Sequence, residues 1–225
     1  MITIELNKKQ DYETYTDFHN FAVAGRNFGA LIRDAHPTVT AENSTQYIDS
    51  FYDDHAQELA KIIEETNNEL GRRSPSFFNF TRHYFGAESH SHEYKGFLSI
   101  FNCNPRFVEN ETFQIYYKKD LLDRIEVAFH EVLHFIFFKY LDLYFKEEIS
   151  QLSKNGGSLW ELSEILNVIL LNEPEAQMVL GRPEELFYPD LQTSLAHHQA
   201  LWEKSGKDMK VFVSSALNLL SSPRS

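Results

Sequence analysis

Two histidines and a glutamate lie within five residues of one another in the middle of an apolar run. The run is "RIEVAFHEVLHFIFFKY", and it surrounds His130, Glu131 and His134 with phenylalanine, valine, isoleucine and leucine. Burying polar groups costs free energy, so their presence there needs a reason. Four residues span slightly more than one helical turn, which places both imidazoles on one face, about 6 Å apart along the axis. The two histidines can therefore bind a single metal ion.

The position of Glu131 suggests what such an ion would do. Glu131 lies about 100° round the helix from His130, beside the ion, where it can hold a water molecule and take its proton. The spacing therefore favours metal-assisted hydrolysis, with Glu131 as the general base. The alternative interpretation is that His130 and His134 are core histidines bonded to neighbouring groups, with Glu131 on a solvated edge.

This motif resembles the active-site helix of the zincin metallopeptidases, over about residues 113–175. The resemblance implies a Zn²⁺ ion on His130 and His134 and hydrolysis of peptide bonds in a peptide or protein substrate. Metzincins continue the motif with a glycine and a third histidine, but Phe137 and Tyr140 occupy those places here, which excludes that branch. In gluzincins the third ligand is a glutamate on a following helix.

Several glutamates could supply that third ligand in a minimal gluzincin-like domain: Glu161, Glu164, Glu173 and Glu175. Glu164 has apolar residues at its helical neighbours, so it would be a buried carboxylate that needs a cation, and we expect it to be the ligand. Asn167 follows one turn later and could hydrogen-bond a ligand. The Asn-Glu-x-x-Ser-Asp signature of well-marked gluzincins is not found around Glu164.

Charge and composition narrow the possible partners and compartments. The formal net charge of −12, from 33 acidic and 21 basic residues, would repel nucleic acid phosphates and anionic lipid. Cys103 is the only cysteine, which is typical of a reducing compartment. The first residues do not resemble a signal peptide, and no stretch of about 18 uncharged apolar residues is present. We therefore expect a cytoplasmic protein that binds neither nucleic acid nor membrane.

The first half of the chain predicts helices followed by two strands. Apolar spacing predicts one helix over residues 11–34, before a proline, and a second from Ser44, its N-cap, to Gly71. Residues 72–95 show no clear period. Phe97–Phe101 and Phe113–Tyr117 predict two antiparallel strands, and the second could be an open sheet edge that pairs with an extended substrate.

The second half predicts helices only. Asp120 is the expected N-cap of the helix that carries the motif, and the turn "SKNGGS" precedes a second helix that is apolar nearly all round. The whole pattern predicts a mostly helical α+β fold with a small antiparallel sheet, an active-site helix and a second buried helix, and the resemblance implies that this fold is zincin-like. We expect a single domain over residues 1–225, with these parts: a helical part at 1–95, a metal-site core at 96–175, and a helical part at 176–225, including short helices around 190–203 and 208–220.

Other residues with chemical potential are assigned ordinary roles. Cys103 is expected to be a buried or partly buried strand residue, and the aromatic runs are expected to be core. Solvated positions are expected for His83, His90, His92, His197 and His198. The resemblance to zincins leaves open that Tyr188, His197 or His198 stabilises the oxyanion. Two alternatives to a peptidase stay open. One is a catalytically inactive metal-binding or protein-interaction module of the same fold, and the other is an all-helical partner-binding protein without metal.

Overall fold

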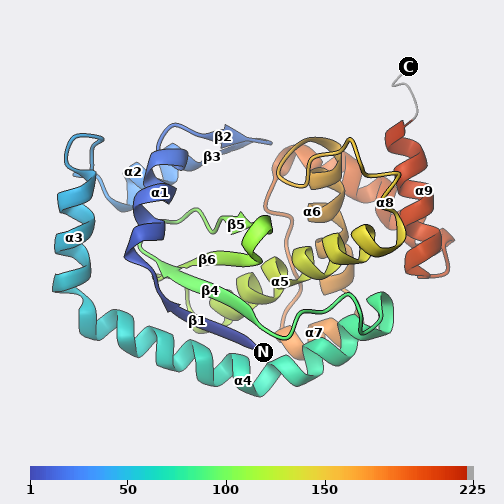
Figure 1. Ribbon diagram of the computed structural model, residues 1–225, viewed down its shortest axis with the longest axis horizontal. Helices are drawn as coiled ribbons and strands as arrows, with labels where there is room; N and C mark the ends of the chain where they lie inside the picture. Colours follow the sequence, from blue (N-terminus) through green and yellow to red (C-terminus); the bar gives the residue numbers. More distant parts are fainter. Residues whose placement is uncertain (222–225) are drawn as a thin grey trace. The chain divides into compact units, whose positions relative to one another are not determined.

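The computed structural model describes residues 1–221, which form a mostly helical α+β fold with a four-stranded mixed sheet (Figure 1). The chain divides into two compact units, and helices α4 (Ala56–Phe85) and α5 (Leu121–Tyr144) contribute residues to both. Unit 1 comprises residues 1–75 and 92–131, and unit 2 comprises residues 76–91 and those from 132 onward. The single-domain organisation stays a prediction. None of the helices in residues 1–221 is long and apolar enough to cross a membrane.

Unit 1 contains the sheet, whose strands run in the order β1, β4, β6, β5 (Figure 1). Their bounds are as follows: β1 Ile2–Leu6, β4 Tyr94–Ser99, β5 Arg106–Phe107 and β6 Thr112–Tyr116. β1 pairs with β4 and β4 with β6 in parallel, whereas β5 is antiparallel to β6. No strand was predicted at β1.

The predicted antiparallel pairing of the two central strands is wrong. β4 and β6 are parallel, with Phe97 opposite Gln114, because the segment between them crosses back before β6 begins. That segment contains β5 and the short 3-10 helix η1 (Val108–Asn110). The predicted open edge at β6 is also wrong, because β6 lies between β4 and β5. β5, and not β6, is the edge strand on that side.

The predicted helix over residues 11–34 is interrupted by a hairpin. The chain forms α1 (Lys8–Phe18), strands β2 (Ala22–Val23) and β3 (Arg26–Asn27), and then α2 (Phe28–Ala35). Ala24 and Gly25 join the two strands with φ of 47° and 81°. Two consecutive positive φ angles match the tight hairpin turn that follows the twist of paired strands. Glycine adopts this conformation without a steric penalty.

The predicted helix from Ser44 to Gly71 is also wrong at both ends and in its middle. Asn43, and not Ser44, occupies the N-cap of α3 (Ser44–Asp54), which ends at a C-cap formed by His55. The next helix, α4, begins at Ala56 and continues past Gly71 to Phe85. α4 even contains a proline, Pro75, which costs about 3 kcal/mol inside a helix. Aromatic burial offsets that cost, at about 2 kcal/mol or more for each side chain. The buried aromatic residues after the proline are Phe77, Phe78, Phe80 and Phe85.

A buried carboxylate ties α1 to α3 and to the sheet in unit 1. Asp11 has no exposed surface, and it accepts hydrogen bonds from Tyr52 Oη at 2.8 Å and Ser99 Oγ at 2.5 Å. The Ile100 amide and Gln114 Nε2 donate two further hydrogen bonds, of 3.1 and 2.8 Å. Burial raises the pKa of Asp11 to about 6, although the four donors oppose that shift. The carboxylate therefore anchors three separate elements.

Unit 2 is helical, as predicted for the C-terminal part. It contains α6 (Gly157–Leu171), α7 (Pro174–Leu180), the 3-10 helix η2 (Pro189–Leu191), α8 (Gln192–Lys204) and α9 (Met209–Ser221). α6 packs against α7 and α8, and α8 packs against α9. The positions of α6, α8 and α9 agree with the predictions, whereas α7 was not predicted.

Candidate metal centre

Helix α5 begins where the sequence predicts. The Asp120 carboxylate accepts a hydrogen bond of 2.8 Å from the Asp123 amide, which confirms Asp120 as the cap. Asp123 lies in the first turn, where a negative charge interacts favourably with the helix dipole. The cap therefore fixes where the helix that carries His130 and His134 begins.

The side chains of the motif lie at different depths. His134 is fully buried, its ring stacked against Phe138, Glu131 is 6% exposed, and His130 is half-buried. Large apolar side chains that neighbour them along α5 are fully buried, among them Phe129, Leu133 and Phe137. The expectation that Glu131 could occupy a solvated edge is therefore wrong.

Helix α6 supplies the third side chain. Almost all of α6 is buried, as its apolar sequence predicts, and Glu164 is 3% exposed. A carboxylate at this depth loses most of its hydration, so it needs hydrogen-bond donors or a cation nearby. Asn167 follows one turn later and is fully buried. Its predicted role beside a ligand stays a prediction.

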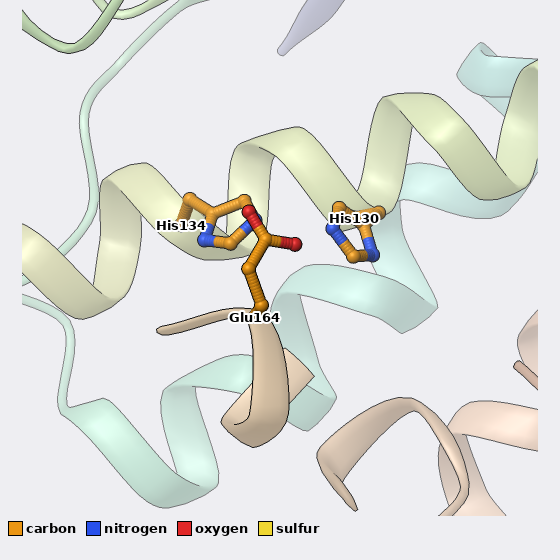
Figure 2. Close-up of side chains that lie close together, drawn as sticks. All are labelled: His130, His134 and Glu164. Carbon is orange, nitrogen blue, oxygen red and sulfur yellow. The ribbon is translucent and has the colours of Figure 1, made fainter. Parts of the chain in front are cut away.

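His130, His134 and Glu164 come together at one point. Figure 2 shows the Glu164 carboxylate directed toward the two imidazoles of α5. Each residue offers one ligand atom, and these three atoms all lie within 4.8 Å of one another. His134 Nε2 and Glu164 Oε1 are 3.6 Å apart. Within residues 1–221, this is the one group of three or more His, Cys, Asp or Glu side chains that could hold an ion.

The separation of His134 and Glu164 fits a shared ion better than a direct hydrogen bond. Ligand atoms about 2.1 Å from a tetrahedral zinc are about 3.4 Å apart, close to the 3.6 Å between His134 Nε2 and Glu164 Oε1. A direct N–H···O hydrogen bond between them would require about 2.7–3.2 Å. Two imidazoles and a carboxylate are a donor set that suits zinc. The residues present therefore fit a bound zinc ion.

The other glutamates proposed as third ligand lie outside this group. Glu161, also on α6, is half-buried, and Glu175 is exposed. Glu173 is buried, but it accepts hydrogen bonds of 2.8 Å from Trp202 Nε1 and from Lys207 Nζ. Its charge is therefore neutralised by a lysine. Of the four candidates, Glu164 alone is grouped with the two histidines.

The remaining histidines and the cysteine have local structural contacts. His90 contacts Thr81 Oγ1 at 2.8 Å and the Gly86 carbonyl at 2.9 Å, and His198 is buried with Nδ1 2.8 Å from the Ser194 carbonyl. His198 is buried, so its expected solvation is wrong, whereas His90 is half-buried. Burial lowers the pKa of both imidazoles. Cys103 is buried as predicted, in a turn and not a strand, and burial raises the pKa of its thiol.

Sequence reasoning missed one charged residue beside the motif. Arg106 lies on β5, and its Nη1 is 3.9 Å from Glu131 Oε2. Both side chains are shielded from solvent, with 10% and 8% of their surfaces exposed. No helical spacing or motif connects these two residues, because their proximity depends on the position of an edge strand. An arginine directly after the Asn-Pro turn was the only local signal.

Comparisons with protein families, curated proteins and solved structures find no match to this chain. The geometry of the group formed by His130, His134 and Glu164, together with the position of Glu131, is therefore what indicates a function.

Proposed function

We propose that the protein is a zinc-dependent peptidase of gluzincin-like type. The observation that carries this proposal is the convergence of His130, His134 and Glu164, with ligand atoms within 4.8 Å of one another. Three protein ligands leave one position of a tetrahedral ion open, which is typical of catalytic zinc sites and not of structural ones. The glutamate next to His130 then stands where hydrolysis needs a base.

Each residue has a distinct role in the proposed reaction. His130, His134 and Glu164 would hold the ion, which supplies a Lewis acid that polarises a peptide carbonyl and makes water more acidic. Glu131 accepts a proton from water as the water oxygen bonds to the carbonyl carbon. Glu131 then donates that proton to the nitrogen as the carbon–nitrogen bond breaks. The products are a carboxylic acid and an amine.

The hydrophobic setting strengthens this assignment of Glu131. The Glu131 side chain is 8% exposed, so bulk water cannot easily exchange with the proton it carries between the two steps. Electrostatic interactions in such a site are also stronger than at the surface. Glu131 is therefore better placed to transfer a proton than an exposed glutamate on the same helix would be.

The substitution Glu131→Gln tests the proposal. It removes the base and preserves shape, so turnover should fall about 10²–10⁴-fold, while zinc content stays that of the wild type. Glu161→Gln, a glutamate on α6 outside the group, is the matched control and should retain full turnover. Cleavage of a labelled unfolded protein such as casein, followed by mass spectrometry of the fragments, gives the rate.

The alternative is a metal-binding or protein-interaction module that hydrolyses nothing. It predicts zinc in both proteins and equal, background-level fragment production from the wild type and Glu131→Gln. That result would overturn the peptidase proposal and leave the metal site standing.

A further inference from the structure

The ion pair between Arg106 and Glu131 is placed where it can control the general base. A guanidinium 3.9 Å from a carboxylate, with both side chains at most 10% exposed, interacts more strongly than a pair in water. Such a buried pair is a weak indicator of stability, because desolvating two charges offsets their attraction. Its position beside the metal ligands therefore suggests a role in the site.

The backbone around Arg106 is held firmly. Arg106 pairs with Phe113 of β6, and the carbonyl of the preceding residue, Pro105, accepts a hydrogen bond of 2.8 Å from the Gln114 amide. Asn104 adopts a left-handed φ of 44°, and its side chain accepts a hydrogen bond of 2.8 Å from the Tyr116 amide. Three consecutive residues are thus fixed to β6, which fixes the point from which the arginine side chain extends.

The Glu131 carboxylate could itself bind the metal as a fourth protein ligand. It follows His130 directly, and carboxylates are good zinc ligands. Even so, the group of ligand atoms within 4.8 Å of one another contains His130, His134 and Glu164 and not Glu131. A fourth protein ligand would close the coordination shell, as in structural zinc sites, and would remove the base. The protein therefore needs a feature that keeps this carboxylate aside.

We propose that Arg106 is a positioning residue that holds the Glu131 carboxylate away from the metal, so that the fourth coordination position stays open and Glu131 stays available as a base. This inference rests on the proposed metal site and deepens the proposed function. Without the guanidinium, the attraction of a divalent cation would draw the neighbouring carboxylate toward it. Arg106, on the edge strand β5, provides a competing positive charge 3.9 Å from that carboxylate.

A double-mutant cycle with Co²⁺ as the probe tests this inference without measuring turnover. The four proteins are the wild type, Arg106→Met, Glu131→Gln and the double variant. Metal-free protein is titrated with Co²⁺, which gives the affinity and the visible absorption spectrum. Acetohydroxamate is then added, because it binds cobalt only where coordination positions are open.

Arg106→Met should bind Co²⁺ about tenfold more tightly than the wild type, with an altered visible spectrum and little response to acetohydroxamate. The added substitution Glu131→Gln should cancel the gain in affinity and restore the response, because the fourth ligand is then lost. Arg124→Met is the matched control: Arg124 is also buried in unit 1, bonded to Thr66 Oγ1 at 2.9 Å, and its loss should leave the affinity for Co²⁺ unchanged.

Equal Co²⁺ affinity and equal acetohydroxamate binding in the wild type and Arg106→Met would overturn the inference. A gain in affinity that persists in the double variant would overturn it as well, because Glu131 would then not be the added ligand. The cycle also separates this inference from the peptidase proposal. A wild type that binds Co²⁺ but never cleaves peptides would refute the peptidase and leave the result of the cycle intact.

Discussion

Asp11 and Glu164 are carboxylates at similar depth, 0% and 3% exposed, yet their neighbours differ in chemistry. The Asp11 carboxylate accepts hydrogen bonds from four groups of unit 1, which belong to Tyr52, Ser99, Ile100 and Gln114. Glu164 instead lies close to the imidazoles of His130 and His134, with which it could hold a metal ion. A buried carboxylate can thus be compensated by the protein's own donors, or it can be part of a site prepared for a cation. The same substitution, carboxylate to amide, should therefore have opposite consequences at the two positions.

Removal of metal should produce the largest difference between the two sites. With free zinc about 1,000-fold above its dissociation constant, binding to the folded state adds about 4 kcal/mol to the free energy of unfolding. A chelator such as EDTA should abolish that contribution in the wild type and in Asp11→Asn, and should change nothing in Glu164→Gln. Urea unfolding with and without chelator measures it. A loss of stability on addition of chelator that is as large in Glu164→Gln as in the wild type would contradict the proposed difference between the two carboxylates.

The substitution Asp11→Asn should reduce stability by about 3 kcal/mol. The asparagine NH2 group cannot accept the hydrogen bonds that one carboxylate oxygen of Asp11 accepts. Each buried donor left without an acceptor costs about 1–3 kcal/mol. Zinc content per folded chain should not change. Glu164→Gln without metal should unfold at the same urea concentration as the metal-free wild type, or at a higher one, since it removes a buried charge. A stable Asp11→Asn protein would show that the donors around Asp11 can rearrange.

The raised pKa of Asp11 should make the free energy of unfolding depend on pH, with a smaller effect than the two substitutions above. Because its folded pKa of about 6 lies above the ordinary aspartate value of 3.8, the folded state binds the proton more tightly than the unfolded state. The associated stabilisation is complete below about pH 4 and is lost as pH rises through about 6, a change on the order of 2 kcal/mol. Urea unfolding of metal-free wild type and Asp11→Asn between pH 4 and 7 measures the difference. A parallel pH dependence in the two proteins would contradict the shift.

Local periodicity predicted those parts of the fold that depend on nearby residues. The cap at Asp120 and the apolar run of α6 were readable because each lies within a few turns of one helix. The continuation of α4 past Pro75 could not be predicted from local sequence, because it depends on the burial of later aromatic residues in the folded chain. The parallel pairing of β4 and β6 depends on a crossover, which alternation along a strand does not encode.

The candidate site divides in the same way. His130, Glu131 and His134 are connected by helical spacing, so the sequence was sufficient to single them out. Glu164 was selected from four glutamates because its helical neighbours are apolar, a property that local sequence does carry. Arg106 lies close to Glu131 only because the sheet brings β5 near α5, and nothing near Arg106 in the sequence indicates that ion pair.

Metal content is the most direct test of the central claim that His130, His134 and Glu164 form a zinc site. Untagged wild type, His134→Ala, Glu164→Ala and the control Glu161→Gln are purified in parallel, and their zinc is measured by elemental mass spectrometry. We predict about one zinc per chain in the wild type and in Glu161→Gln, and less than about a tenth of that in the other two. A wild type without metal, or zinc retained in both ligand variants, would contradict the claim and identify the two histidines as core residues.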